Sequence, residues 1–227
     1  MGNNLEEVEH LLLIDGSGFI FRAYHALPQL RKSDGTPTGA VAGYCNMLFK
    51  ILNEMEKFKA SHLAVIFDQK DKTFRSDIYP EYKANRPPPP EDLVPQFDII
   101  REATRAFGIE SIEKKGFEAD DIIATLSKEA NDIGAKVTIF SSDKDLMQLV
   151  SEETLMYDPI KNTYINIDKV KEKFGVSPNK VIEVQSLIGD AVDNVPGVPG
   201  IGIKTASQLI SNFNTVENLI DNNAQID

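Results

Sequence analysis

Cysteine and histidine are scarce in this chain of 227 residues, and long apolar runs are missing. The single cysteine, Cys45, rules out a disulfide framework and a cysteine-based zinc site within the sequence, and it fits a reducing compartment. Three histidines are too few for a histidine-rich metal site. No apolar run reaches the roughly 18 residues of a membrane-spanning helix, and residues 1–10 are polar and acidic, unlike a signal peptide. We therefore expect a soluble, cytoplasmic protein of one large or two modest domains.

The net charge of −11 on its face argues against a nucleic-acid partner. Nine of the 35 acidic residues belong to the motifs described below, however, and the other 26 nearly balance the 24 lysines and arginines. Divalent cations bound to one acidic cluster would neutralise most of the excess charge. The net charge therefore does not decide the partner.

Aliphatic runs alternate with helical patterns along the chain. Residues 11–15 form an aliphatic run of the kind found in strands that are buried on both faces of a parallel sheet. Further strands are predicted at about 62–68, 109–113, 136–141, 154–157 and 163–165. Helices are predicted at about 19–26, 40–58, 93–107, 118–133, 143–150, 177–188 and 203–212. The alternation predicts an α/β fold with a mainly parallel central sheet flanked by helices.

Acidic residues gather at one predicted edge of this sheet. Three strands run into Asp15, Asp68 and Asp143, and the carboxyl ends of parallel strands are where open α/β sheets bind ligands. The remaining acids follow at a helix start and at two turns: Glu118, Asp120, Asp121, Asp145, Asp190 and Asp193. Any one of them alone suits a helix cap or a surface position. Five acidic stations on one edge instead indicate a site for divalent metal ions.

The type and number of these ligands favour Mg²⁺ or Mn²⁺, which prefer carboxylates and water. Two such ions about 3.5–4 Å apart can clamp the attacking and leaving oxygens of a phosphodiester. Asp143 and Asp145, two residues apart, can reach different ions. Asp190 and Asp193 share a face if their turn is helical. The pattern predicts a two-metal phosphodiesterase site.

Residues 69–95 form a long connection that ends in four prolines at 87–90. Such connections are usually functional lids or disordered segments. This one combines cations with aromatic rings: Lys70, Lys72, Arg75, Lys83 and Arg86 with Phe74, Tyr79 and Tyr82. Cations beside stacking rings suit single-stranded nucleic acid. The alternative is a solvated loop with a proline-rich brace.

Three glycines, Gly197, Gly200 and Gly202, lie between two predicted helices, and Lys204 and Thr205 open the second helix. Glycines let backbone amides approach a phosphate closely, and a helix N-terminus favours the same anion. The alternative is an ordinary turn between helices. No strand precedes the glycines, so they are not a dinucleotide-binding fingerprint.

Taken in order, these motifs resemble the 5′ nuclease (flap endonuclease) superfamily, and within it the N-terminal 5′→3′ exonuclease domains of bacterial DNA polymerase I. The resemblance covers about residue 10 to the end, and it rests on residues 15–17, 67–68, 73–75, 82–86, 118–121, 142–146 and 189–197. It implies a PIN/resolvase-like nuclease domain at 10–172 with a helical arch at about 69–95. It also implies a flexible N-terminus at 1–9 and a truncated helix-hairpin-helix subdomain at 173–227.

The resemblance further implies a divalent-metal-dependent enzyme that hydrolyses phosphodiesters near a 5′ end or flap junction and removes RNA primers in replication and repair. The first metal group would be Asp15, Asp68, Glu118, Asp120 and Asp143, and the second Asp145, Asp190 and Asp193, with Asp121 ambiguous. Lys83 and Arg86 would steer the scissile phosphate. The other implied DNA contacts are Arg22, Arg75, Tyr82 as a stacking residue, and the glycine hairpin with Lys204 and Thr205, sometimes around a K⁺ ion.

The implied partners are DNA with a 5′ flap, nick or gap, RNA primers on DNA, and a covalently linked polymerase domain. A monomer associated with the bacterial nucleoid is expected. Two alternatives remain at this point. A PIN-type ribonuclease would share the acids but lack the arch and the glycine hairpin. A metal-independent DNA-structure binding module would use the acids as caps only.

Overall fold

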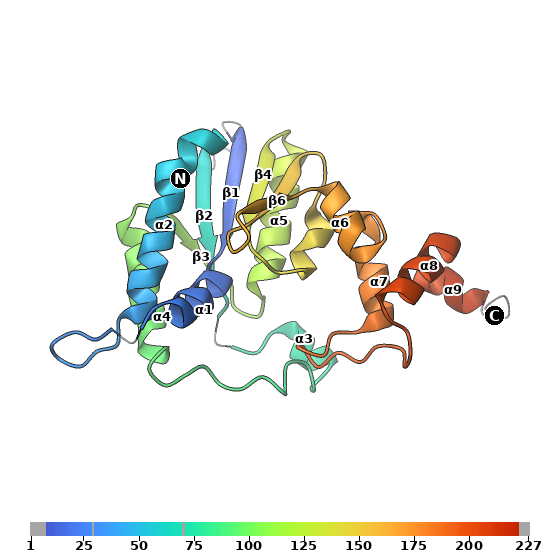
Figure 1. Cartoon of the computed structure of the whole chain (residues 1–227), viewed down its shortest axis with the longest axis horizontal. Helices are drawn as coiled ribbons and strands as arrows, with labels where there is room; N and C mark the ends of the chain where they lie inside the picture. The colour runs from blue at the N-terminus through green and yellow to red at the C-terminus, as the bar shows by residue number, and fades with distance from the viewer. Residues whose placement is uncertain (1–7, 29, 70, 223–227) are drawn as a thin grey trace.

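The computed structural model describes residues 8–28, 30–69 and 71–222. Most of the expected flexible N-terminus, Lys70 of the arch and residues 223–227 lie outside the described residues. A central sheet stands between two groups of helices, and the C-terminal helices extend away from one side of it (Figure 1). Within the described part, no helix is both long and apolar enough to cross a membrane.

The sheet has six strands in the order β3-β2-β1-β4-β5-β6. All neighbouring strands are parallel except β5 and β6, which form an antiparallel pair at one edge. The mainly parallel sheet predicted from the sequence is therefore confirmed. The strands are β1 His10–Asp15, β2 His62–Ile66, β3 Glu110–Ile112, β4 Lys136–Phe140, β5 Thr154–Asp158 and β6 Thr163–Ile165.

Side chains of the central strands alternate between two cores, one on each face of the sheet. Leu12 and Ile14 of β1 pack with helices α1 Gly16–Ala26, α2 Gly39–Phe58 and α4 Val94–Ala106. Leu13 packs on the opposite face with α5 Ala119–Asp132 and α6 Ile167–Phe174. Because both faces are covered, the strand needs no polar face, which explains its unbroken aliphatic sequence.

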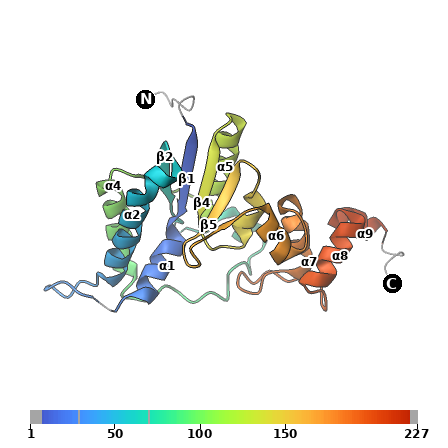
Figure 2. The same ribbon diagram turned by 45° about the horizontal axis from the view of Figure 1, so that its top comes forward.

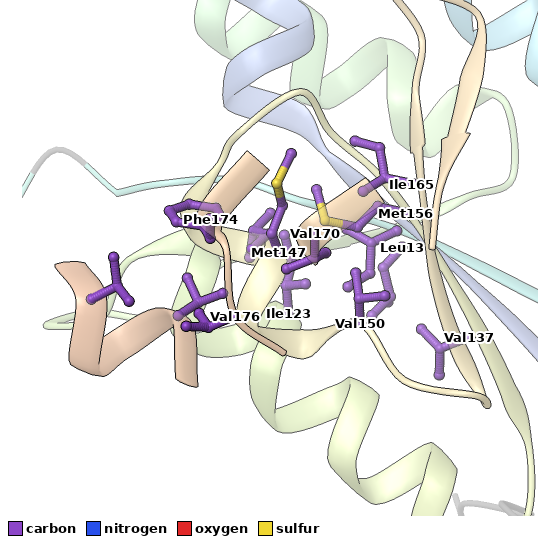
Figure 3. Close-up of a cluster of buried hydrophobic side chains, with 14 of the residues drawn as sticks. Leu13, Ile123, Val137, Met147, Val150, Met156, Ile165, Val170, Phe174 and Val176 are labelled. Carbon is purple, nitrogen blue, oxygen red and sulfur yellow. The ribbon is translucent and has the colours of Figure 1, made fainter. Parts of the chain in front are cut away.

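The second core joins the C-terminal helices to the sheet. Figure 3 shows Leu13 and Met156 of the strands beside Ile123 of α5 and Val170 and Phe174 of α6. Buried residues of the later elements continue the same cluster. Those elements are η2 Asp145–Leu149, η3 Pro178–Lys180, α7 Val181–Ile188, α8 Ile203–Phe213 and α9 Val216–Asp221.

The segment 69–95 crosses beneath the carboxyl ends of the strands in both views (Figures 1 and 2). It contains one short helix, α3 Phe74–Ile78, that the sequence did not predict. The helix expected at 143–150 is instead the short 3₁₀ turn η2, because Asp143 accepts the backbone N–H of Asp145 and stays outside it. Strand β2 ends two residues before Asp68.

Candidate functional site

A cavity of about 280 Å³ opens at the carboxyl edge of the sheet. We call it the acidic cavity. Its walls come from the ends of β1, β2 and β4, the start of α5, and the turn after α7. Eight of the nine predicted acids line it: Asp15, Asp68, Glu118, Asp120, Asp143, Asp145, Asp190 and Asp193. The fold thus brings together acids that are up to 178 positions apart in the sequence, as the difference between positions 15 and 193 shows.

Asp15 is held at the mouth of β1 by local hydrogen bonds. Its carboxylate accepts the N–H of Gly18 at 2.9 Å, which caps α1, and the hydroxyl of Ser141 at 2.8 Å. The pKa of Asp15 is raised to about 6, chiefly by burial and also by the charges of Asp68 and Asp143, and the two hydrogen bonds only partly offset this rise. Asp15 therefore lies where its negative charge is poorly compensated.

Asp120 is the second acid with a strongly shifted proton equilibrium. Its pKa is raised to about 8, chiefly by burial and also by repulsion from Asp143, Asp15 and Asp68, and the attraction of Lys83 does not offset these effects. Repulsion between crowded carboxylates is relieved by a bound cation. The electrostatics of this wall of the cavity therefore favour a positive ion.

Asp68 and Asp143 are oriented by backbone groups. The Asp68 carboxylate accepts the N–H of Ala119 at 2.7 Å, at the start of α5. The N–H of Asp143 donates to the Ser141 hydroxyl at 3.0 Å, while its carboxylate accepts the N–H of Asp145 at 2.9 Å. These bonds leave further carboxylate lone pairs available at the cavity.

The base of the arch lies directly on the acids of the opposite wall. The Lys83 ammonium is 3.0 Å from the Glu118 carboxylate and 3.7 Å from that of Asp193, and Arg86 also pairs with Asp193. Tyr82, expected to stack on a base, directs its hydroxyl to Glu118 at 3.0 Å and Asp193 at 3.2 Å. The predicted phosphate-steering cations thus face the predicted metal ligands.

Lys144 is a cavity residue that the sequence analysis missed, although its position between two predicted ligands was a signal. Its ammonium lies 2.6 Å from the Asp190 carboxylate. Burial opposes the shift, but the bonds from Lys144 and from backbone N–H groups lower the pKa of Asp190 below its usual range. Gln185 of α7 hydrogen-bonds Asp145 in a similar supporting role.

Asp121 is the one predicted acid that does not line the acidic cavity. It lines a neighbouring cavity of about 420 Å³, which it shares with five of the other acids, and its two carboxylate oxygens accept Arg75 at 2.7 and 2.8 Å. It also accepts the N–H of Glu118 at 2.9 Å. Burial alone would raise the pKa of Asp121, but the hydrogen bonds and the charge of Arg75 lower it below its usual range. This residue joins the arch to α5, and Arg75 is engaged there.

The arch is also tied to the turn after α7 through main-chain groups. The amide of Asn85 donates to the Ala191 carbonyl at 2.9 Å, and the amide of Asn194 donates to the Glu81 carbonyl at 2.7 Å. The N–H of Lys83 donates to the Asp193 carbonyl at 2.8 Å. These three bonds, which the sequence analysis missed, fix the position of the arch relative to the turn after α7.

The predicted hairpin glycines differ in their surroundings. A Cβ on Gly197 would lie 2.2 Å from the Ile188 carbonyl oxygen, so this glycine closes the turn against α7. Gly200, with φ of +81°, and Gly202, the N-cap of α8, have open space around them. The two predicted contacts at the start of α8 are exposed: Lys204 and Thr205.

Arg22 lies outside the acidic cavity. It lines a separate pocket of about 90 Å³ together with Lys50 and Asn162. Its Nη1 atom is buried and has no hydrogen-bond partner among the described residues. The structure therefore does not bring this predicted phosphate contact together with the carboxylates.

The donor set fits a hard divalent cation by its chemistry. All donors are carboxylate oxygens, which Mg²⁺ and Mn²⁺ prefer. Within the described ranges, no three acids, histidines or cysteines converge closely enough to form a ready ligand cluster. Cationic side chains pair with Glu118, Asp190 and Asp193. The site therefore suits a cation because of the negative charge of its other carboxylates, and not because a complete set of ligands is already in place.

Two family models together match almost the whole chain. The 5′-3′ exonuclease, N-terminal resolvase-like domain matches residues 10–175, and the 5′-3′ exonuclease, C-terminal SAM fold matches residues 176–227. The chain belongs to the 5′-3′ exonuclease family. This membership confirms the resemblance found in the sequence.

Relatives within the 5′-3′ exonuclease family include DNA polymerase I of Rhizobium leguminosarum, which is 56% identical over 98% of this chain. The chain spans 22% of that relative's length. A 5′-3′ exonuclease of Aquifex aeolicus is 42% identical over 93% of this chain, which spans 72% of the relative.

Solved structures of similar fold include a bacteriophage T5 5′-exonuclease with bound divalent metal ions (zinc). It has a TM-score of 0.80 and 22% sequence identity, and the match covers 94% of this chain and 79% of the phage protein. At that identity the likeness establishes the fold alone. The resolvase-like sheet of the 5′-3′ exonuclease family is therefore confirmed in this chain.

Proposed function

We propose that this chain is a structure-specific 5′→3′ exonuclease and flap endonuclease that depends on two Mg²⁺ or Mn²⁺ ions. Its substrates are DNA with a 5′ flap, nick or gap, and RNA primers paired with DNA. The observation that carries the proposal is the acidic cavity itself, where eight carboxylates face Lys83 and Arg86 of the arch.

The carboxylates divide into two ligand groups in this proposal. The first ion would be held by Asp15, Asp68, Glu118, Asp120 and Asp143, and the second by Asp145, Asp190 and Asp193. The chemistry that divalent ions supply at such a site is activation of water and stabilisation of the leaving oxygen. Asp121 belongs to neither group, because Arg75 occupies both of its oxygens.

The arch supplies positive charge to the scissile phosphate. Lys83 and Arg86 now pair with Glu118 and Asp193. With Glu118 and Asp193 engaged as metal ligands, Lys83 and Arg86 would be free to neutralise the charge that develops on the phosphate oxygens. The Tyr82 hydroxyl would lose the same two partners, and its ring could then stack on the 5′-terminal base.

The helix-hairpin-helix grips the duplex in this proposal. Gly200 and Gly202 have open space for close approach of a phosphate, and Lys204 and Thr205 add polar groups at the N-terminus of α8. A K⁺ ion at this hairpin would bridge it to the DNA. Arg22 and Arg75 are assigned to more distant phosphates.

Similarities support the choice of substrate. A bacteriophage T5 flap endonuclease, 23% identical to this chain with a TM-score of 0.78, was crystallised with DNA and metal ions. Bacterial relatives named DNA polymerase I extend the expectation to a covalently linked polymerase domain and to replication and repair at the nucleoid. All eight acids come from one chain, so a monomer suffices.

Substitution of Asp143 tests the function. Asp143→Asn should lower Mg²⁺-dependent cleavage of a 5′-flap substrate by at least about 100-fold, because it removes a ligand rather than a supporting group. The matched control is Asp132→Asn, since Asp132 is exposed on α5, outside the acidic cavity, and pairs with Lys128. Circular dichroism should show the same fold in both variants.

Other outcomes identify the alternatives. Cleavage by Asp143→Asn at the wild-type rate would reject the metal assignment. Binding of flap DNA that survives EDTA, with no product formed at any Mg²⁺ concentration, would indicate a binding module. Cleavage of single-stranded RNA without any dependence on a 5′ end would indicate a PIN-type ribonuclease.

A further inference from the structure

Arg101 is a largely buried cation that lies outside the acidic cavity and has no role assigned to it above. It belongs to α4, and its side chain is 14% exposed. Its Nη2 atom donates to the main-chain carbonyl of Asp68 at 2.9 Å, and its Nε atom donates to Glu113 at 2.9 Å. The guanidinium also lies 5.1 Å from the centre of the Phe67 ring. One side chain thus connects α4 with the segments that follow β2 and β3.

Asp68 depends on such a connection because it lies beyond the sheet. The N–H of Phe67 still pairs with the carbonyl of Ile112, at 2.9 Å, as an extension of the β2–β3 ladder. The N–H of Asp68 donates instead to the hydroxyl of Ser17 at 3.2 Å, and its carbonyl accepts Arg101. Side chains of α1 and α4 therefore hold the main chain of Asp68 where the sheet no longer does.

The same residue marks the origin of the arch. Its carboxylate is fixed by the N–H of Ala119 at 2.7 Å, at the start of α5. The chain beyond Asp68 runs into the arch that carries Lys83 and Arg86. In the function proposed above, substrate binding separates those cations from Glu118 and Asp193, with which they pair here. Because Asp68 directly precedes the arch, movement of the arch would shift the main chain of Asp68 if the Asp68 carbonyl were not anchored.

The burial of Arg101 is unfavourable in free energy, and a purely stabilising role does not explain it. Its Nη1 atom is buried and has no partner among the described residues. A buried, incompletely paired charge is usually less favourable than an apolar side chain of similar size. The planar fork is explained if it is needed to hold the Asp68 carbonyl and Glu113 in fixed relation.

We propose that Arg101 is a positioning residue for Asp68. It anchors the Asp68 main chain to α4 and β3, so that the carboxylate keeps its place in the acidic cavity while the arch moves. The inference rests on the proposed function, in which Asp68 is a ligand of the first metal ion. Glu113 acts with Arg101 by fixing the orientation of the guanidinium.

Mn²⁺ binding to the whole chain without DNA gives a direct test. Arg101→Lys keeps the charge but loses the fork, and calorimetry should show about 10-fold weaker binding of the tighter Mn²⁺ ion, the effect expected of a group that orients a ligand. With flap DNA, KM should stay unchanged, and kcat should recover as Mn²⁺ reaches saturation. Arg105→Lys, an exposed residue on the same helix, should match the wild type. Wild-type Mn²⁺ affinity in Arg101→Lys would overturn the inference.

A double-mutant cycle separates positioning from general stability. In an Asp68→Asn background, Arg101→Lys should have no further effect on Mn²⁺ affinity, since the ligand it positions is gone. An equal loss in both backgrounds, with a lowered melting temperature, would contradict positioning. If Arg101→Lys folds poorly, Glu113→Gln replaces it and should weaken Mn²⁺ binding by a few-fold.

The same measurements distinguish this inference from the proposed function. If Asp68→Asn leaves Mn²⁺ binding unchanged, Asp68 is not a ligand and the metal assignment of the proposed function fails at this residue. If Asp68→Asn weakens binding and Arg101→Lys does not, the metal assignment stands and the positioning role of Arg101 is wrong.

Discussion

Individual carboxylates of the acidic cavity differ in what balances their charge. Glu118 and Asp193 touch cations of the arch, and Asp190 touches Lys144. Asp15 and Asp120 make no ion pair with a lysine or arginine in the described ranges, and burial, with added repulsion from neighbouring carboxylates, raises the pKa of each. Asp15 and Asp120 can therefore attract a metal ion directly. Glu118, Asp190 and Asp193 must first release the lysine or arginine with which each is paired.

The raised pKa values predict how the metal-free protein responds to pH. Asp15 and Asp120 have folded pKa values of about 6 and about 8, above the ordinary 3.8. The folded state thus binds more protons than the unfolded state between pH 4 and 8, and stability falls as pH rises through this window. In EDTA, the melting temperature should be roughly 5 °C lower at pH 8.5 than at pH 6.

Asp120→Asn provides the control for this pH effect, because it removes the larger of the two shifts. The decline should be much shallower in the variant, and Mg²⁺ should restore the stability of the wild type at pH 8.5. Equal pH dependence in wild type and Asp120→Asn would show that the carboxylate is not the source.

Neighbouring aspartates of α5 should behave in opposite ways. Asp121 is held by two bonds from Arg75, so Asp121→Asn should cost about 1–2 kcal/mol of stability, between the values for an exposed ion pair and for a charged hydrogen bond. Its Mn²⁺ affinity should stay within about twofold of the wild type, because the residue lies outside the acidic cavity. Chemical denaturation and calorimetry measure the two quantities. Loss of Mn²⁺ binding at unchanged stability would contradict this assignment.

At this scale the sequence identified the acids better than their partners. Strand ends, a helix start and turns are local features of the sequence, and the eight acids of the cavity were found from them. The sequence left Asp121 unresolved beside Asp120, since successive residues of a helix point about 100° apart and the pattern does not say which one faces the cavity. Lys144 and Arg101 act through contacts with residues distant in sequence, and no local pattern reports such contacts.

Among the elements, the long periodic helices and buried strands were predicted close to their observed bounds. Short elements were not: α3 has five residues, and η2 replaces an expected helix. Their form depends on side-chain contacts, such as Arg75 with Asp121 and Asp143 with the Asp145 N–H, rather than on periodicity. The strand β2 also stops before Asp68, where side chains of other helices take over.

The glycine hairpin combines two requirements that substitution can separate. Gly197→Ala would place a methyl group 2.2 Å from the Ile188 carbonyl and should destabilise the fold by about 3 kcal/mol or more. Gly202→Ala meets open space at a φ of −95°, so its melting temperature should stay near the wild type. Its duplex-DNA affinity should fall, because a methyl group limits close approach to a phosphate.

Thermal melting and DNA titration at fixed salt measure the two effects of these substitutions. Gly197→Ala with a wild-type melting temperature would contradict the packing role of that residue. Gly202→Ala with undiminished DNA affinity would remove the hairpin amides from the proposed DNA interface.

For the whole molecule, topology explains how the nuclease function that we propose is compatible with an acidic chain. The parallel strands place their carboxyl ends on one edge, and the arch and the turn after α7 meet there, as both views show (Figures 1 and 2). The acidic cavity thereby gathers eight carboxylates against three cationic side chains, and bound cations can neutralise this local excess of negative charge. The sequence predicted this convergence from the order of strands and helices, but not the three hydrogen bonds to main-chain carbonyls that tie the arch to the turn after α7.

Anomalous diffraction from crystals soaked in Mn²⁺ tests the central claim most directly. We predict two manganese ions inside the acidic cavity, about 3.5–4 Å apart, one beside Asp15, Asp68 and Asp120 and the other toward Asp190 and Asp193. Lys83 and Arg86 should have withdrawn from the carboxylates. Manganese bound at scattered surface acids, with the cavity still closed by the arch cations, would contradict the account.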